Sequence, residues 1–351
     1  MKALYWDGQK LTLKASQPSP EPARDQALVR VRLAGICSTD LQIFKGYMGF
    51  RGVPGHEFVG EAVEGPPAFM GQRVVGEINF ACGRCEFCRR GLGRHCAKRQ
   101  VMGILGADGC FAEAVAVPAR NLHLVPDGVS DEEAVFTEPL AAAFEILEQV
   151  EIDPSTRAPA MAGGHSLGIP PQSRGVGSGA PGLPGGLHFT HEVLVFGDGK
   201  LGLLCAQVVA LTGARVTLVG KHPDKLRLAK AAGVRTVLLA DWQSQRADIV
   251  IDATGSSSGL ETALGAVRPR GTLVLKSTCA EDHRLSLAPV VINEITVVGS
   301  RCGLFPPALD ALAQKKVSVT PMIEKIYPLS DALDAVAHAG RAGACKILIK
   351  N

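Results

Sequence analysis

Residues 193–202 read VLVFGDGKLG, an apolar run that leads into three glycines spaced as G-x-G-x-x-G. The spacing alone is a weak signal, but here it follows a strand pattern and opens an apolar helix pattern, the context that gives it meaning. In that context Gly197 permits a tight turn, Gly199 lets the backbone approach a pyrophosphate, and Gly202 lets the helix pack closely on the strand. The stretch therefore predicts a dinucleotide-binding unit; a glycine-rich turn that binds nothing is the alternative.

Strand and helix patterns alternate around this stretch. Strands are expected at 193–196, 215–219, 248–253 and 272–275, and helices at 200–211 and 224–232. Such alternation predicts a parallel, doubly wound sheet of the Rossmann type. We assign residues 191–303 to this domain.

The end of the second expected strand should decide which dinucleotide is preferred. In a Rossmann unit, an acidic residue about 20 residues beyond the fingerprint binds the ribose 2′-OH of NAD. That position is Gly220, so no carboxylate is expected there to repel a 2′-phosphate, and Lys221 and His222 follow it. We therefore expect NADP to be preferred, with NAD bound through its pyrophosphate as the alternative. The expected cofactor-binding residues are Gly197, Gly199, Lys200, Leu201, Gly202, Gly220, Lys221, His222 and Thr254.

The first 150 residues follow a different pattern, in which Gly and Pro separate short strands. Strands are expected at 27–33, 57–63, 72–78 and 111–117, each with alternating apolar residues. This pattern predicts a barrel-like, β-rich unit. A helix is expected at 132–150, because Ser130 and Glu133 form a capping-box pattern at its start.

The C-terminal end should return to this β-rich unit. The helix expected at 330–339 and the strand expected at 346–349 are too short to stand alone. We therefore assign residues 1–150 and 304–351 to one domain.

A candidate metal site lies in the β-rich unit. The stretch GICSTD at 35–40 places a thiol, two hydroxyls and a carboxylate in consecutive positions, and His56-Glu57 follows downstream. Cys, His and Glu are zinc-ligand types, and a catalytic zinc needs three protein ligands and one open position. Together with Glu138, these residues predict a catalytic metal site. The alternative is a buried structural Cys37 beside a hydrogen-bonded core His56.

A second metal site is predicted by a cysteine cluster. The residues Cys82, Cys85, Cys88 and Cys96 have the spacing C-x2-C-x2-C-x7-C. Four thiolates this close can surround Zn²⁺ and leave no open position, as a structural site requires. An iron–sulfur cluster is one alternative. A nucleic-acid-binding ribbon is another, since arginines and lysines surround the cysteines, but no aromatic stacking platform accompanies them.

Composition argues against several classes of protein. The chain has 351 residues, 46% of them hydrophobic and 20% charged, and a net charge of +3, which does not favour nucleic acid or an anionic membrane. No apolar run approaches the ~18 residues of a membrane span, and the N-terminus lacks a signal-peptide pattern. Four of the ten cysteines fall within fifteen positions, a metal spacing that favours a reducing, cytoplasmic location.

One segment carries no core-forming pattern. From Pro154 to His191 the chain has no acidic residue and no lysine, and Gly, Pro and Ser dominate. Such a composition cannot bury enough apolar surface to offset its ordering entropy. We expect residues 154–190 to form a mobile, low-complexity insert, with incidental metal contact through His165, His188 or His191 as the alternative.

The order of these motifs resembles the medium-chain dehydrogenase/reductase family, and most closely its zinc-dependent alcohol and polyol dehydrogenases, such as sorbitol, threonine and glucose dehydrogenases. The motifs that carry the resemblance are GIC at 35–37, GHE at 55–57, the four-cysteine cluster, EPLA at 138–141 and the glycine fingerprint. The resemblance implies a GroES-like fold for the β-rich domain. It also implies that Cys37 and His56 bind a catalytic zinc, that Glu57 and Glu138 can exchange at the metal, and that the hydroxyl of Thr39 relays the substrate's proton.

Three features depart from the family pattern. Gln42 stands where many relatives carry a histidine, so the outer proton relay lacks its usual residue. The stretch at 61–66 is shorter than usual, and the insert replaces a short connection.

The implied activity is hydride transfer between a small alcohol, polyol or sugar and a nicotinamide cofactor. The resemblance also implies one catalytic and one structural zinc, and a homodimer or homotetramer. The alternatives are a zinc-free medium-chain reductase and a cofactor-binding regulatory or structural protein without turnover. The substrate pocket would be built by the loops at 46–50 and 302–305, where single residues decide the chain length and polarity that the pocket accepts.

Overall fold

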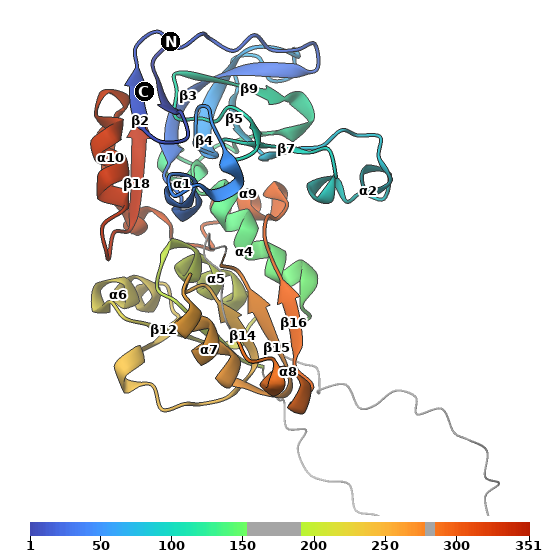
Figure 1. The fold of residues 1–351 in the computed structure, drawn as a ribbon, viewed down its shortest axis with the longest axis vertical. Coiled ribbons are helices and arrows are strands. Elements are labelled where there is room, and N and C mark those ends of the chain that lie inside the picture. Colours follow the sequence, from blue (N-terminus) through green and yellow to red (C-terminus); the bar gives the residue numbers. More distant parts are fainter. Residues whose placement is uncertain (153–190, 278–284) are drawn as a thin grey trace, which may run out of the picture.

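The chain forms a β-rich part and a parallel-sheet part, with the long helix α4 between them (Figure 1). The computed structural model describes residues 1–152, 191–277 and 285–351. The insert expected at 154–190 lies outside the described residues. Every helix of the described residues is too short or too polar to cross a membrane.

The β-rich part is built on a seven-stranded sheet with the order β10-β5-β4-β3-β18-β17, and β9 pairs with the far end of β3. The strands of this part are β1 (Ala3–Trp6), β2 (Leu11–Lys14), β3 (Gln26–Gly35), β4 (Glu57–Glu64), β5 (Arg73–Gly76), β6 (Asn79–Phe80), β7 (Gln100–Met102), β8 (Gly106–Ala107), β9 (Ala114–Pro118), β10 (Leu122–Leu124), β17 (Ile323–Pro328) and β18 (Lys346–Lys350). In β3, Val29, Val31 and Leu33 are buried while Arg30 and Arg32 are exposed, the period-two pattern expected from the sequence.

The prediction of a single helix at 132–150 is wrong. The segment is divided into α3 (Asp131–Ala134) and α4 (Thr137–Gln149). Pro139 explains the break, because a proline has no N–H to donate to the carbonyl of Val135 and its ring would clash there, whereas it is tolerated in the first turn of α4. The capping box at the start of α3 is confirmed: the Ser130 hydroxyl accepts from the Glu133 N–H, and the Glu133 carboxylate accepts from the Ser130 N–H.

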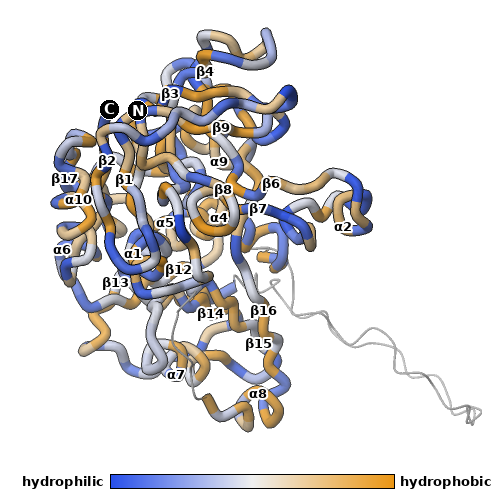
Figure 2. Tube along the Cα trace, turned by 45° about the horizontal axis from the view of Figure 1, so that its top comes forward, coloured by the Kyte–Doolittle hydropathy of each residue, from blue (hydrophilic) through white to orange (hydrophobic). Residues whose placement is uncertain are grey.

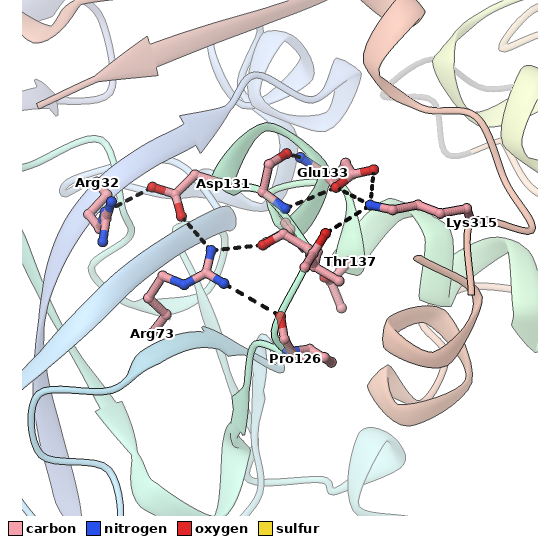
Figure 3. Close-up of polar contacts among 11 residues, drawn as sticks. Arg32, Arg73, Pro126, Asp131, Glu133, Thr137 and Lys315 are labelled. Carbon is pink, nitrogen blue, oxygen red and sulfur yellow. Dashed lines mark hydrogen bonds and ion pairs between the residues drawn. The ribbon is translucent and has the colours of Figure 1, made fainter. Parts of the chain in front are cut away.

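A polar network holds the start of α3 in place (Figure 3). The carboxylate of Asp131 pairs with Arg32 of β3 at 2.8 Å and with Arg73 of β5 at 3.1 Å. Glu133 accepts from Lys315, which follows α9 (Phe305–Ala313), at 2.7 Å. These contacts join the β-sheet, α3 and the segment after α9, and so fix the direction in which α4 leaves α3.

The second part contains a six-stranded parallel sheet with the order β13-β12-β11-β14-β15-β16. Its strands are β11 (Glu192–Phe196), β12 (Arg215–Gly220), β13 (Arg235–Leu238), β14 (Ala247–Asp252), β15 (Val267–Leu275) and β16 (Thr296–Gly299), and its helices are α5 (Lys200–Ala210), α6 (Pro223–Ala231), α7 (Ser257–Gly265) and α8 (Ala288–Ile292). This confirms the doubly wound Rossmann sheet. The order reverses between β11 and β14, the switch point at which such sheets bind ligands. The edge strands β13 and β16 were not predicted, although TVL at 236–238 and ITVV at 295–298 carry β-branched and apolar residues.

The C-terminal segment returns to the first sheet. It contains β17 (Ile323–Pro328), α10 (Ala332–Ala339) and β18 (Lys346–Lys350), and β18 pairs antiparallel with β3.

The remaining short helices of the β-rich part are α1 (Ser38–Ile43) and α2 (Glu86–Arg89). The largest cluster of buried apolar residues joins both parts of the chain. It includes Leu33 of β3, Leu204 of α5 and Phe305 of α9. The domain boundaries given above stay a prediction.

Candidate active site

A cavity of about 710 Å³ lies between the two parts of the chain. Its wall contains all the residues predicted for the catalytic site and most of those predicted for the cofactor site. These are Cys37, Thr39, His56, Glu57, Glu138, Gly197, Gly199, Lys200, Leu201, Gly220, Lys221, His222 and Thr254. The remaining predicted residue, Gly202, is buried in α5. The fold thus brings two motifs about 160 residues apart in the chain to one space.

Cys37 is placed by the turn between β3 and α1. It is the N-cap of α1, and the carboxylate of Asp40 accepts from the Cys37 N–H at 2.8 Å to complete a capping box. The thiol accepts from the Thr39 N–H at 3.5 Å and lies 3.7 Å from the Thr39 hydroxyl. The cap therefore fixes the sulfur and the hydroxyl side by side at the cavity wall.

His56 is buried against the carboxylate of Asp40. His56 Nδ1 lies 3.1 Å from Asp40 Oδ1, an ion-pair distance, although the two atoms do not meet hydrogen-bond geometry. Burial alone would lower the pKa of His56, but the charge of Asp40 raises it well above the usual value. A carboxylate behind a histidine fixes the orientation of the ring and makes its free nitrogen a better metal ligand.

Two glutamates lie at the same wall. Glu57, at the start of β4, forms an ion pair with Lys346 of β18, and both side chains are only 1% exposed. Glu138 lies in the first turn of α4, and burial raises its pKa to about 7. Of these two glutamates, Glu57 alone has a carboxylate oxygen within 4.8 Å of both the Cys37 sulfur and a His56 ring nitrogen.

The group Cys37, His56 and Glu57 fits a metal ion. One ligand atom from each residue lies within 4.8 Å of the other two, and the group opens onto the cavity. Three protein ligands beside an open position are the arrangement of a catalytic zinc. A metal would require His56 in its neutral form, so metal and proton compete for this residue.

The glycine fingerprint fits a pyrophosphate. Gly197 has φ +105°, and a Cβ there would lie 2.5 Å from the Ala253 carbonyl oxygen. A Cβ on Gly202 would lie 1.8 Å from the Gly197 carbonyl oxygen, so this position requires glycine for close packing. Gly199 is the N-cap of α5 and has open space where a Cβ would stand. The helix N–H groups therefore face the cavity without a side chain in the way.

The four cysteines of the second predicted site converge. Cys82, Cys85, Cys88 and Cys96 all lie within 4.8 Å of one another, and three of their sulfur–sulfur distances are 3.9, 3.4 and 3.7 Å. A tetrahedral zinc with Zn–S bonds of about 2.3 Å holds its sulfurs about 3.8 Å apart. A cluster of several irons would hold at least some of the sulfurs farther apart, because the four thiolates are shared among two or four irons. The geometry fits a single tetrahedral ion.

Sequence reasoning missed four side chains of this site. Asp40 supports His56, Lys346 pairs with Glu57, and Lys276 donates to three oxygens between α4 and the end of the Rossmann sheet. The fourth is Asp198, inside the fingerprint itself, which contacts His222. Asp40 and Asp198 stand within the motifs and could have been singled out. Lys276 and Lys346 carry no sequence signal, because their partners are distant in the chain.

The candidate metal ligands and the dinucleotide-binding turn face one cavity. This combination defines the class of metal-dependent and nicotinamide-dependent oxidoreductases. Two family models match the chain: one described as an alcohol dehydrogenase GroES-like domain, over residues 23–127, and one described as a zinc-binding dehydrogenase, over residues 201–314. The chain belongs to the medium-chain dehydrogenase/reductase family of zinc-dependent alcohol and polyol dehydrogenases, as the sequence motifs predicted.

Curated relatives and solved structures agree with this assignment. An L-threonine 3-dehydrogenase of Chelativorans sp. is 32% identical over 80% of this chain and 78% of its own length. A sorbitol dehydrogenase of Halalkalibacterium halodurans is 28% identical over 95% of this chain and 94% of its own. A protein of Sinorhizobium meliloti 1021, assigned as a zinc-binding dehydrogenase and bound to NADP, aligns with a TM-score of 0.81 and 25% identity over 100% and 99% of the two chains. The chain is thus an NAD(P)-dependent alcohol or polyol dehydrogenase of the zinc-dependent type.

Proposed function

We propose that the protein transfers a hydride between a small alcohol, polyol or sugar and the nicotinamide of a dinucleotide cofactor. One observation carries the proposal: the ligand group Cys37, His56 and Glu57 lines the same cavity as the fingerprint turn. A substrate hydroxyl at the first and a nicotinamide held by the second would share one space. The relatives named for sorbitol and threonine support this class of substrate.

In this proposal Cys37 and His56 hold the catalytic zinc, with Glu57 and Glu138 as its further candidate ligands. When bound there, zinc supplies a Lewis acid that makes a substrate hydroxyl more acidic. Asp40 orients His56, and Lys346 holds Glu57 at the edge of the group. Glu138 lines the same cavity from α4, whereas Glu57 lines it from β4.

Thr39 is the proposed proton acceptor for the substrate hydroxyl. Its hydroxyl lies 3.7 Å from the Cys37 sulfur and lines the cavity, so it is held beside the metal group. A positioned hydroxyl can pass a proton outward only through a further partner. Gln42, one turn later in α1, replaces the histidine expected for that step.

We propose a second, structural zinc on Cys82, Cys85, Cys88 and Cys96. Backbone N–H groups of Arg84 and Cys85 lower the pKa of the Cys82 thiol to about 6, whereas burial raises the pKa of the Cys88 thiol to about 11. Support for the site therefore comes from the convergence of the four sulfurs. Reading these cysteines as metal ligands also supports a cytoplasmic location for the protein, which stays a prediction.

The cofactor is an NAD(P) dinucleotide, and its exact form is a proposal. The sequence predicts NADP, because Gly220 has no carboxylate and because Lys221 and His222 follow it and line the cavity. The Sinorhizobium meliloti protein is bound to NADP. The structure adds the carboxylate of Asp198 beside the same residues, and this negative charge favours the opposite choice.

We also propose a homodimer or homotetramer. The strand β16 is an edge of the Rossmann sheet, and α8 lies near it (Figures 1 and 2). Leu287, the N-cap of α8, is 65% exposed, and Val291 and Ile292 of α8 are 75% and 77% exposed. An exposed edge strand and an apolar patch together suit a symmetric contact with a second copy. Light scattering of the purified protein should give a dimer or tetramer mass, and Ile292→Asp should lower it; a monomeric wild type would contradict the proposal.

The experiment for the whole proposal combines metal analysis with turnover. We expect two zinc ions per chain and alcohol-dependent reduction of a nicotinamide cofactor when a panel of alcohols, polyols and aldoses is tested. Cys37→Ser should stay folded, keep the structural zinc and lose nearly all activity. Turnover without zinc would instead support the zinc-free reductase, and cofactor binding without turnover on any alcohol would support the regulatory or structural alternative.

A further inference from the structure

The carboxylate of Asp198 occupies the space above Gly220 at the end of β12. A Cβ built on Gly220 would lie 2.5 Å from both Cβ and Oδ2 of Asp198. The volume into which a side chain at position 220 would project is therefore already filled by a carboxylate. That carboxylate comes from the fingerprint turn after β11, the neighbouring strand.

The Asp198 side chain is fixed in this place by His222. Oδ2 accepts from the His222 backbone N–H at 2.6 Å, and His222 Nδ1 lies 3.0 and 3.1 Å from the two carboxylate oxygens. Because a carboxylate only accepts, Nδ1 carries the proton that faces it. Burial alone would raise the pKa of Asp198, but the hydrogen bonds from His222 hold it below its usual value, so the group is ionised.

This carboxylate keeps free acceptor positions. A carboxylate offers about four lone-pair positions, and the two described donors, both from His222, leave about half of them unused. Asp198 lines the cavity together with Gly197, Gly199 and Gly220. An adenine ribose bound over the end of the second strand therefore meets an anionic acceptor there, although residue 220 is a glycine.

We propose that Asp198 is a specificity-determining residue, which takes the place of the missing acidic residue at position 220, accepts hydrogen bonds from the ribose hydroxyls of NAD and repels the 2′-phosphate of NADP. The proposal rests on the proposed cofactor site and reverses the preference expected from the sequence. The two basic residues that suggested NADP are Lys221 and His222. The His222 ring is engaged by Asp198, and Lys221 is exposed to water, which screens its charge.

The test uses nucleotide fragments that need neither nicotinamide, metal nor alcohol. ADP-ribose and its 2′-phosphate are titrated into the full chain by calorimetry, and the selectivity is the ratio of their dissociation constants. The wild type should bind ADP-ribose at least about tenfold more tightly, since hydrogen bonds to a charged group are among the strong ones. Asp198→Asn, which keeps the shape and one acceptor oxygen, should lower this ratio by about tenfold.

Two further variants separate a local charge effect from a disturbed turn. Asp224→Asn makes the same chemical change at an exposed residue of α6 that pairs with Arg227, and should leave the ratio within about twofold. Asp198→Ala with Gly220→Asp returns the carboxylate to the usual position and should restore the ratio to within about threefold of the wild type. Melting temperatures identify which variants are folded.

The outcomes distinguish this inference from the proposed function. A wild type that binds the 2′-phosphate equally or more tightly overturns the inference, as does an Asp198→Asn ratio within about twofold of the wild type. A folded double variant that does not recover selectivity also overturns it. If neither fragment binds, the cofactor site itself is wrong and this inference with it. Selective binding in a protein that oxidises no alcohol would uphold the inference and reject the proposed function.

Discussion

Lys346 should contribute strongly to stability, because it neutralises a carboxylate that water does not reach. Lys346 and Glu57 are each 1% exposed and form an ion pair between β18 and β4. Burial alone would lower the pKa of Lys346, but the charge of Glu57 raises it, so the lysine is charged. In the metal-free protein, on which this comparison is made, Lys346→Met would leave the Glu57 carboxylate buried without a cation.

The expected loss is about 3–5 kcal/mol, which is the usual cost of removing one partner of a buried pair. This is a large part of the roughly 5–15 kcal/mol that stabilises a folded protein. Urea unfolding followed by circular dichroism measures the loss. Lys350→Met is the matched control: it lies on the same strand but is exposed, and should change stability by no more than about 0.5 kcal/mol.

A double variant tests whether the cost comes from the unpaired charge. Glu57→Gln combined with Lys346→Met removes both charges together, so it should be more stable than Lys346→Met alone. If Lys346→Met loses less than about 1 kcal/mol, or if the double variant is no more stable than the single one, the reasoning from the buried charge is refuted.

Three further predictions concern the four-cysteine cluster and its surroundings, and the start of α3. Cys82→Ser should lose one zinc ion per chain by elemental analysis and lower the melting temperature, because structural zinc contributes to folding. An unchanged zinc content would contradict the proposed zinc site in the four-cysteine cluster. Arg94, beside the four cysteines, pairs with Glu145 of α4. Arg94→Met should cost about 3 kcal/mol in urea unfolding, since it leaves Glu145 buried and unpaired. Arg90→Gln, from an exposed pair, should change little, and equal effects of the two changes would contradict a stabilising role of the Arg94–Glu145 pair. Burial would raise the pKa of Glu133, but Lys315 and Ser130 lower it. The contribution of Glu133 to the free energy of unfolding is therefore present above its unfolded-state pKa and is lost as the pH falls through the lower folded-state pKa. Glu133→Gln should cost about 1 kcal/mol at neutral pH and nothing at strongly acidic pH, and a pH-independent difference would contradict this.

Much of the site was predictable because its chemistry is local in the chain. Cys37 and Thr39 lie in one turn, the four cysteines lie within fifteen positions, and the glycines of the fingerprint are fixed by the close approach of one strand and one helix. The Rossmann sheet was predictable for a related reason, since buried parallel strands are apolar along their whole length. The break before α4 was missed although its cause, Pro139, was visible.

What the sequence determined by itself is the kinds of groups present and their spacing over a few residues: the ligand types, the closed cysteine cluster and the dinucleotide turn. Only the tertiary structure decided which distant groups share a buried space. Lys346 meets Glu57 across 289 positions of the chain, and Asp198 enters the place left empty by Gly220. Neither contact has a sequence pattern, because it depends on the pairing of separate strands and on the direction in which each side chain leaves its backbone. In a low-dielectric interior such contacts are strong, so they determine the charge of the metal group and, we infer, the choice of cofactor.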